Sequence, residues 1–352
     1  MKILFVDIIL DGHHRAYLDA LISKAHYEAI LALPERIENL ECRQYLFSPI
    51  DFFHKKLKDY LNWLNEISTI ADTESPDIIH FLYGDVFYKF FGLGLNQINK
   101  KYKTIITLHG KRNGKLYGYS IKAIFQQICM GVVHTDVIWK ELKSAGIKNV
   151  YHIEYPCFAS YENLNRESAR IKMGLLPKGK VLGCLGSTRY DKGLDFLLES
   201  LKNVSADYEV IIAGKPEAWN EAHIKELAGD SWPYIHLLLK YLTDEEFQTA
   251  LIACDIIVLP YRRSFNGASG PLTEGIWNNK VIIGPNHGSL GAMIKENHLG
   301  YTFESENIHS LAETIENALN SEFEYDNVAL QYKASLSVEY FKHKYTELYH
   351  KK

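Results

Sequence analysis

Short, continuously apolar runs rich in Ile, Val and Leu recur along the chain, separated by segments long enough for a helix. Continuous runs, rather than alternating ones, are typical of strands buried on both faces of a parallel sheet. This alternation predicts an α/β protein with two doubly wound domains. The first-half runs are Lys2–Val6, Ala29–Leu33, Ile78–Leu82, Thr104–Leu108, Gly131–His134 and Val150–Ile153. The second-half runs are Val181–Leu185, Tyr208–Ala213, Ile235–Leu239, Asp255–Leu259, Val281–Gly284 and Gly300–Phe303.

The segments between these runs have helical periodicity, and the end of the chain is the clearest case. There Val338, Phe341, Tyr345 and Leu348 are spaced for one apolar helix face. A polar stretch after Phe158 indicates the break between the two domains. We therefore predict an N-terminal domain over residues 1–158, a second domain over residues 159–334 and a C-terminal helix over residues 335–352.

Composition excludes several classes of protein. Hydrophobic residues make up 47% and charged residues 23% of the 352 residues, as in ordinary globular proteins. The longest stretch without a charged residue, Val281–Ile294, contains Pro285 and is too short for a membrane span. The five cysteines form no CxxC pair, so we expect neither a zinc site nor a disulfide framework. A net charge of −4 argues against nucleic-acid binding, and we expect a cytoplasmic location.

A glycine-bounded turn, Gly186 to Gly193, follows the first strand of the second half and leads into a helix. Such a turn offers backbone N–H groups and a positive helix end to an anion. Arg189 and Lys192 add two cations at a spacing that suits a diphosphate. The alternative is that both side chains are ordinary solvated loop charges.

A second segment, Leu259 to Gly275, follows another predicted buried strand and contains small residues from Gly267 to Gly270. Small residues let the backbone approach a ligand closely, and Pro271 favours a helix start. Glu274 would then lie one turn into the helix, near enough to reach hydroxyl groups. Alternatively, its carboxylate only complements the helix dipole.

Together, the two segments resemble the retaining nucleotide-sugar glycosyltransferases of glycosyltransferase family 4. The resemblance covers nearly the whole chain and implies the GT-B fold, two Rossmann-like domains that face a central cleft. It also implies that the final helix crosses back to the first domain. The expected substrates are a nucleotide sugar and a glycan or lipid-linked acceptor, with no cofactor.

The resemblance assigns roles in the second domain. Arg189 and Lys192 would bind the donor diphosphate as catalytic residues, and Glu274 would hold the ribose hydroxyls. The backbone of the small-residue stretch would lie against the donor sugar and phosphate, and the base would sit mostly against main chain. The further donor-binding residues are Asn266, Gly267, Ala268, Ser269, Gly270, Gly214, Tyr241 and Leu242.

In the first domain, His109 follows a buried strand and looks like the family's histidine near the donor-sugar hydroxyls and the transferred carbon. A lone histidine there can also be purely structural. The first strand leads to a loop where acceptor and diphosphate would meet, and Gly12 gives room there for the donor. His13, His14 and Arg15 are the candidate acceptor contacts, against the alternative of a plain surface loop.

The chain departs from the family pattern at Asn266, where the family has glutamate. The family's arginine more often lies five residues before the lysine, where this chain has Ser187, and Arg189 matches a variant arrangement. Asn266 therefore keeps open a degenerate member that binds a nucleotide or acts as a scaffold. A nucleotide-sugar epimerase is a further alternative. The sequence has no Asp-x-Asp, which favours metal-independent transfer, and no Gly-x-Gly-x-x-Gly after the first strand, which disfavours an oxidoreductase.

Two basic, aromatic stretches in the first half, Phe52–Leu64 and Lys111–Lys122, could contact an anionic membrane or a lipid-linked acceptor. The alternative is a pair of solvated helices with extended lysine side chains. The resemblance as a whole implies a retaining hexosyltransferase of polysaccharide or glycoconjugate synthesis, cytoplasmic or peripheral at the inner membrane face.

Overall fold

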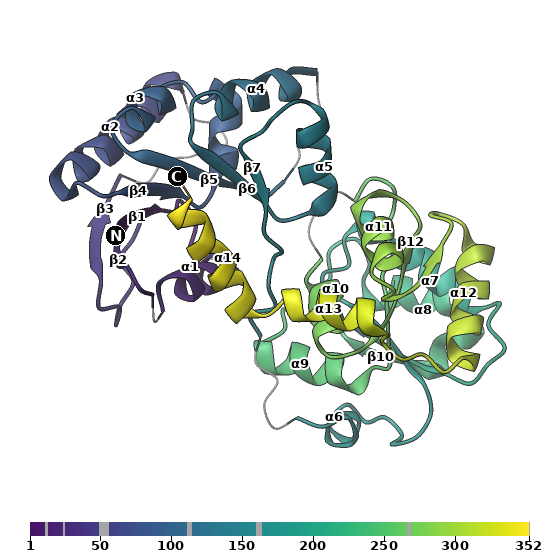
Figure 1. The fold of residues 1–352 in the computed structure, drawn as a ribbon. Coiled ribbons are helices and arrows are strands. Elements are labelled where there is room, and N and C mark those ends of the chain that lie inside the picture. The colour runs from purple at the N-terminus through teal and green to yellow at the C-terminus, as the bar shows by residue number, and fades with distance from the viewer. Residues whose placement is uncertain are drawn as a thin grey trace. The chain divides into compact units, whose positions relative to one another are not determined.

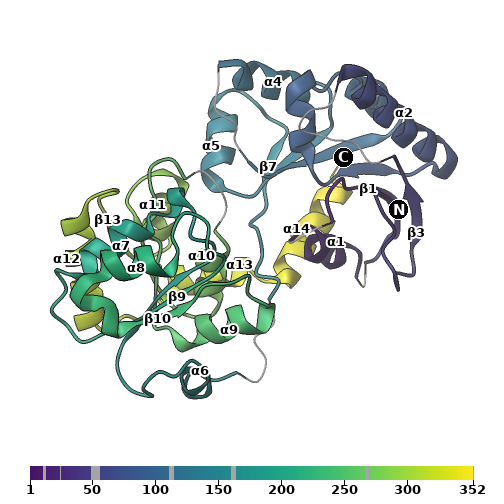
Figure 2. The ribbon, with the colours of Figure 1, turned by 180° about the vertical axis from the view of Figure 1, so that it is seen from behind.

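The computed structural model describes residues 1–10, 13–23, 25–48, 56–110, 115–159, 164–265 and 269–351. These form two compact units. The first contains Met1–Phe158 together with Val338–Lys352, and the second contains Ala159–Ser337. The chain therefore returns to its first unit at the end, where the yellow helix α14 (Val338–His350) lies beside α1 (His13–Ile22) in Figures 1 and 2.

The first unit is built on a parallel sheet with the strand order β3-β2-β1-β4-β5-β6-β7. The order reverses between β1 and β4, and the ends of these two neighbouring strands are where ligands bind in open α/β sheets. The central strands are buried on both faces because their side chains are almost all apolar. The strands are β1 (Lys2–Val6), β2 (Glu28–Leu33), β3 (Arg43–Leu46), β4 (Ile78–Phe81), β5 (Lys103–Leu108), β6 (Met130–Val133) and β7 (Val150–His152).

Helices cover both faces of this sheet. On one face, Trp63 and Phe87 lie at the centre of a core formed with α2, α3, α4 and the 3-10 helix η1. On the other face, Tyr17 of α1 packs with Phe341 and Tyr345 of α14. The remaining helices of the unit are α2 (Leu57–Glu74), η1 (Gly84–Phe90), α3 (Leu95–Asn99), α4 (Lys115–Phe125) and α5 (Asp136–Ser144).

The second unit has a parallel sheet with the order β10-β9-β8-β11-β12-β13, which reverses between β8 and β11. Leucines of α7 and α12 cover one face, and α9, α10 and α11 cover the other. Its strands are β8 (Val181–Leu185), β9 (Glu209–Ala213), β10 (Ile235–Leu238), β11 (Ile256–Val258), β12 (Val281–Pro285) and β13 (Gly300–Phe303). Its helices are α6 (Arg166–Lys172), η2 (Tyr190–Lys192), α7 (Leu194–Leu201), α8 (Glu221–Ala228), η3 (Gly229–Tyr234), α9 (Asp244–Ala253), α10 (Gly270–Trp277), α11 (Gly288–Glu296), α12 (Ile308–Asn320) and α13 (Asn327–Ser335).

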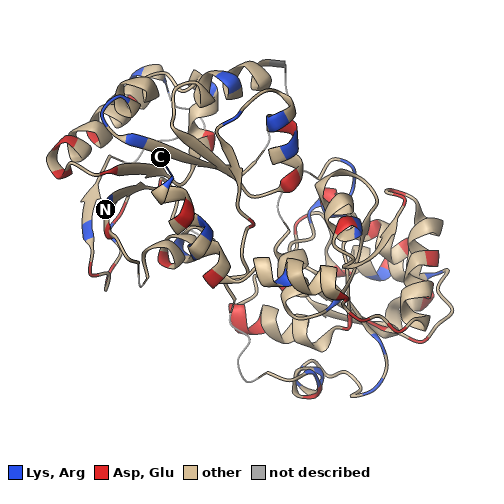
Figure 3. Ribbon diagram, viewed as in Figure 1, with Lys and Arg blue, Asp and Glu red and all other residues tan. Residues whose placement is uncertain are grey.

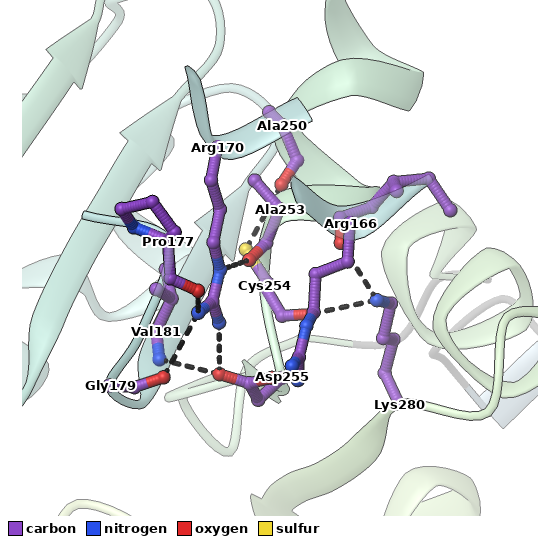
Figure 4. Close-up of polar contacts among 11 residues, drawn as sticks. Arg166, Arg170, Pro177, Gly179, Val181, Ala250, Ala253, Cys254, Asp255 and Lys280 are labelled. Atoms are coloured by element: carbon purple, nitrogen blue, oxygen red, sulfur yellow. Dashed lines mark hydrogen bonds and ion pairs between the residues drawn. The ribbon is translucent and has the colours of Figure 1, made fainter. Parts of the chain in front are cut away.

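A buried ionic cluster fixes α6 to this second sheet (Figure 4). Arg170 is fully buried, and its guanidinium donates to Asp255 and to the carbonyl oxygens of Ala253, Pro177 and Gly179 at 2.5–3.0 Å. Every guanidinium nitrogen thus has an acceptor, which is what a buried arginine requires.

The twelve predicted strands all form, with ends that shift by one residue or less. The sequence prediction missed β3, because this edge strand is short and only partly buried and therefore lacks a continuous apolar run. Acidic and basic residues are interspersed over the helices of both units (Figure 3). The two basic, aromatic stretches fall partly outside the described residues, at 52–55 and 111–114. Among the helices described, none has the length and hydropathy of a membrane span.

Candidate active site

The turn after β8 has a backbone that only glycine can supply. Gly186 has φ 104° and Gly193 has φ 62°, both in the left-handed region. A Cβ atom on Gly193 would lie 2.1 Å from the carbonyl oxygen of Pro260, so the turn packs directly on the segment after β11. The predicted glycine turn is therefore present, and its middle residues, Tyr190–Lys192, form the 3-10 helix η2.

Lys192 points its ammonium group back across this turn. Its Nζ atom lies 5.6 Å from the ring centroid of Tyr261, and a Cβ on Gly186 would approach Nζ to 2.6 Å. Burial lowers the pKa of Lys192 from its ordinary value. Within the described part of the chain, Nζ has no carboxylate or carbonyl oxygen at hydrogen-bonding distance. A partly desolvated ammonium without an acceptor is a favourable place for an anion.

Arg189 lies three residues before Lys192 and is held by its neighbour Asp191. The guanidinium donates two hydrogen bonds, of 2.9 and 2.8 Å, to the two carboxylate oxygens. This contact raises the pKa of Arg189 and lowers that of Asp191. Both side chains remain substantially exposed, at 46% and 30%, so a ligand can compete for the guanidinium.

Arg262 is a residue of this site that sequence reasoning did not single out. It is buried, donates to the carbonyl of Tyr190 at 2.8 Å and to Asp195 at 2.5 Å, and lies 3.9 and 4.4 Å from the ring centroids of Tyr190 and Phe196. Its own N–H donates to the carbonyl of Asp191. Arg262 therefore clamps the turn to the segment after β11, and its only sequence signal was its place directly after a buried strand.

The helix α10 begins where the sequence predicted. Ser269 is its N-cap: the hydroxyl accepts from the N–H of Leu272 at 3.4 Å and lies 3.1 Å from the hydroxyl of Tyr261. Glu274 lies one turn further, with a carboxylate oxygen 3.8 Å from the position of a Cβ on Gly270. Carboxylate, cap and first-turn N–H groups thus share one helix end, while Asn266, Gly267 and Ala268 lie outside the described residues.

Gly214 is brought against the same turn. It has φ 147°, and a Cβ there would lie 2.1 Å from the carbonyl oxygen of Gly186, so the ends of β8 and β9 approach backbone to backbone. Tyr241 is 84% exposed, and Leu242 is partly buried against the core of the unit. Among the described residues, neither side chain forms a hydrogen bond, an ion pair or a ring contact with the Lys192 turn.

In the first unit, His109 follows β5 and is fixed by main-chain contacts. Its Nε2 donates to the carbonyl of Leu82 at 2.7 Å, and its backbone N–H donates to Asp85 at 3.0 Å. The ring stacks on Tyr83 at 5.6 Å between centroids. Burial lowers the pKa of His109 to about 4, so the imidazole is neutral at physiological pH and Nδ1 is left as an acceptor.

The predicted acceptor-binding residues at the start of α1 differ from one another in their partners. His14 lies 3.1 Å from the carboxylate of Asp7 through Nδ1, and its ring centroid is 5.2 Å from that of His109. Arg15 pairs with Asp19 one helical turn along, at 2.8 Å. Gly12 lies outside the described residues, as does the side chain of His13.

Behind these histidines a chain of buried polar groups joins β4, β5, β6, α1 and α14. Its links are Tyr349–His80, His80–Thr107, Thr107–Tyr345, Tyr345–Tyr17 and Tyr17–His134. Burial lowers the pKa of His80 to about 3 and that of His134 well below its usual range. The chain is therefore neutral, and it ties α14 to the strands that carry the site.

Comparisons with known proteins bear on the second unit and on the fold of the chain. Residues 165–334 match the family described as glycosyl transferases group 1. The group 1 match lies within the second unit, which carries the Lys192 turn, and covers just under half of the chain. No curated protein sequence matches the chain significantly.

Solved structures are similar over almost the entire chain. A glycosyltransferase from Rickettsia africae has a TM-score of 0.74 at 17% identity, covering 99% of this chain and 97% of its own. Sucrose-phosphate synthase from Thermosynechococcus elongatus has 0.73 at 12%, covering 99% and 98%. HepE from Anabaena, in complex with UDP, has 0.75 at 14%, covering 99% of each chain. These likenesses confirm the predicted fold, the GT-B fold of glycosyltransferases.

Proposed function

We propose that the protein is a retaining, metal-independent glycosyltransferase of family 4. It moves a hexosyl unit from a nucleoside-diphosphate sugar to a hydroxyl of a glycan or lipid-linked acceptor, in polysaccharide or glycoconjugate synthesis. The observation that carries the proposal is the ammonium group of Lys192, partly buried between Gly186 and Tyr261 with no acceptor among the described residues. The group 1 match of the same unit supports it, and HepE, which has this fold, binds UDP.

Lys192 and Arg189 stabilise the leaving diphosphate in this proposal. As the bond between the sugar carbon and the phosphate oxygen breaks, negative charge grows on the diphosphate. A cation that is already in place and partly desolvated stabilises that charge more than water does. Arg189 adds a second, planar donor once it exchanges Asp191 for phosphate oxygens. Two cations of this kind supply the charge that a divalent ion provides in other transferases.

The end of α10 holds the rest of the donor. First-turn N–H groups of the helix favour phosphate oxygens, and the carboxylate of Glu274 accepts hydrogen bonds from the two ribose hydroxyls. Gly214 packs against the backbone of Gly186 and so adds main chain without a side chain beside the turn, which suits the flat face of a base. His109, neutral and with Nδ1 as an acceptor, binds a hydroxyl of the transferred sugar.

A panel of UDP, GDP and ADP, with thermal unfolding as the readout, tests donor binding. A ligand at about 100 times its Kd stabilises the protein by about 2.7 kcal/mol. Lys192→Ala should abolish this stabilisation, whereas Lys202→Ala, which removes an exposed lysine of the same unit paired with Glu199, should preserve it. If none of the three nucleotides stabilises the wild-type protein, the proposal is wrong.

Two further measurements test the finer parts of the proposal. Turnover after EDTA treatment should be unchanged, and a complete loss that Mn²⁺ or Mg²⁺ restores would contradict metal independence. The anomeric configuration of the product, read by NMR, should equal that of the donor. Nucleotide binding without any sugar turnover would favour the degenerate, non-catalytic alternative.

A further inference from the structure

Tyr261 is a buried tyrosine of the second unit that contacts both the Lys192 turn and the start of α10. It follows β11 in the chain and is 1% exposed. Its ring faces the ammonium group of Lys192, whose Nζ lies 5.6 Å from the ring centroid. Its hydroxyl lies 3.1 Å from Oγ of Ser269, the N-cap of α10. The two ends of one side chain therefore reach the two elements that bind phosphate in the proposed function.

The ring contact holds the ammonium of Lys192 without using its N–H groups. An aromatic face attracts a cation within about 6 Å of its centroid, and most strongly when the cation is desolvated. Lys192 is partly desolvated, and its Nζ has no acceptor oxygen at hydrogen-bonding distance in the part of the chain that the structure describes. A carboxylate in the place of the ring would neutralise the ammonium, whereas the ring leaves three N–H donors available to phosphate oxygens.

Phe265 extends this aromatic support to the second cation of the turn. Its ring centroid lies 4.3 Å from that of Tyr261, and Cζ of Arg189 lies 6.0 Å from the Phe265 centroid. Both cations of the Lys192 turn thus lie against one pair of rings, and both rings belong to the segment after β11.

The hydroxyl contact reaches the first turn of α10. Oγ of Ser269 accepts from the N–H of Leu272 at 3.4 Å, and its second lone pair is open to the tyrosine hydroxyl. Burial raises the pKa of Tyr261, so the phenol keeps its proton. A phenylalanine would fill the same volume, so packing alone does not call for the hydroxyl. Among the described residues, the N-cap of α10 is its one hydrogen-bonding partner.

We propose that Tyr261 is a positioning residue of the donor site, which fixes the spacing between the ammonium of Lys192 and the first-turn N–H groups of α10. The inference rests on the proposed glycosyl transfer, in which both elements bind the donor phosphates. A tyrosine ring is rigid and has only two side-chain torsions, so a buried one relates the positions of the groups at its two ends. Donors that are already at the spacing of the ligand need no rearrangement when it binds or reacts.

The hydroxyl contact is tested by calorimetric titration with UDP, GDP and ADP. Tyr261→Phe keeps the ring and removes one hydrogen bond, so the nucleotide that stabilises the wild type should bind about two- to tenfold more weakly. Ser269→Ala should also weaken binding. The double variant should bind no more weakly than Ser269→Ala alone, because both substitutions remove the same link.

Tyr208→Phe is the matched control for this comparison. The hydroxyl of Tyr208 donates to Oγ of Ser231 at 3.3 Å, so it also belongs to a tyrosine–serine pair of the second unit. Tyr208 lies just before β9, whereas the Lys192 turn follows the end of the parallel neighbour β8, so the two pairs lie at opposite ends of the sheet. Its substitution should leave nucleotide binding unchanged.

The ring contact is tested by turnover, measured as nucleoside diphosphate release from UDP-, GDP- and ADP-glucose with octyl glucoside as the acceptor. Tyr261→Phe should raise KM for the donor and keep kcat within about twofold, since the ring still holds Lys192. Tyr261→Leu should in addition lower kcat by about 5- to 30-fold, because the cation loses its aromatic partner. In a Lys192→Met background the Leu and Phe variants should turn over equally, since no cation is left for the ring to hold.

Three results overturn this inference alone, provided that Lys192→Ala is impaired. They are wild-type nucleotide affinity in Tyr261→Phe, additive losses when it is combined with Ser269→Ala, and a difference between the Leu and Phe variants that persists in the Lys192→Met background. The last result would make the ring an ordinary core residue. If Tyr261→Leu does not fold, the combination of Tyr261→Phe with Ser269→Ala decides. A wild-type protein that binds no nucleotide or turns over no sugar overturns the proposed function, and this inference with it.

Discussion

The second unit contains two groups made of arginine, lysine and aspartate, one buried and one at a turn. In the buried group (Figure 4), Asp255 pairs with Arg170, and the ammonium of Lys280 donates to the carbonyl oxygens of Ile252 and Cys254 at 3.0 and 2.7 Å. Every cation there has its acceptors within the protein. Such a group fixes α6, β8 and β11 and has nothing left to offer a ligand.

The Lys192 turn contains the same residue types, but its cations remain available to a ligand. Lys192 has no acceptor among the described residues, and the Arg189–Asp191 pair is open to solvent. Residue type therefore does not separate a structural charge from a functional one. What separates them is whether the fold satisfies the charge, because an unsatisfied and partly buried cation costs stability until an anion arrives.

The largest expected effect is on stability, in the buried group. Arg170→Ala leaves Asp255 without its buried partner and should lower the free energy of unfolding by about 3–5 kcal/mol. Arg166→Ala is the matched control, because Arg166 pairs with the same carboxylate but is 59% exposed, so its loss should cost about 1 kcal/mol or less. Chemical denaturation measures both. Equal losses would show that burial does not distinguish the two pairs.

The next effect is on turnover, at the turn. Lys192→Met should slow turnover by about 10²- to 10³-fold, about 2.7–4 kcal/mol of barrier, because a preorganised charge on the diphosphate is lost. Since burial disfavours the charged form of Lys192, the neutral side chain should leave the melting temperature unchanged or higher. A lower melting temperature together with near-normal turnover would place Lys192 in the same class as Lys280.

Much of the fold could be predicted from the sequence, because continuous apolar runs indicate strands that are buried on both faces of a sheet. The glycine turn at Gly186–Gly193 was also readable, since positive φ and close backbone approach demand glycine. The sequence did not show which of the charged side chains are buried. Arg170 and Arg189 look alike in sequence, and only the packing of α6 against β8 and β11 makes one of them structural.

The candidate site shows the same limit. His14 and His109 were identified, but the groups that fix their rings, Asp7 after β1 and Leu82 after β4, were not. The sequence analysis did not single out Asp7. Arg262 clamps the Lys192 turn through contacts that no spacing rule describes. For His109 and Arg262, the contacts that fix the side chain come from residues 27 or more positions away in the sequence.

A smaller effect extends the comparison to the first unit, where the buried polar chain that includes His80 and Thr107 is neutral rather than charged. The pKa of His80 is lowered to about 3 and that of His109 to about 4, so both stay neutral in the folded state while the unfolded chain protonates below about 6.5. Stability is thus fully present above pH 6.5 and falls by about 1.4 kcal/mol per pH unit for each histidine as pH drops toward 4. Asp7, whose pKa is raised, opposes this in part.

Hydrogen exchange followed by mass spectrometry between pH 7 and 4.5 distinguishes the two units. Protection should decline first in β4, β5 and α14 of the first unit. The second unit should lose less protection. Burial lowers the pKa of one partly buried histidine there, His287, and the lowered pKa of a carboxyl such as Asp191 costs stability only near and below pH 3.8. His80→Gln should reduce the pH dependence of the first unit. Equal loss in both units would contradict the assignment of the neutral groups.

The smallest effect concerns Asp191, which holds Arg189 at the turn. An exposed pair contributes about 1 kcal/mol or less, so Asp191→Asn should barely change the melting temperature. It should nevertheless tighten nucleoside diphosphate binding by up to about fivefold, because a competing acceptor and a repelling negative charge both leave the site. Calorimetric titration with the nucleotide that stabilises the wild type measures this. Weaker binding would mean that Asp191 holds Arg189 in its productive position. Asp191 would then be part of the nucleotide-binding site and not a competitor of the nucleotide for Arg189. Lys192 alone would then differ from the Arg170 group in lacking an acceptor within the described protein.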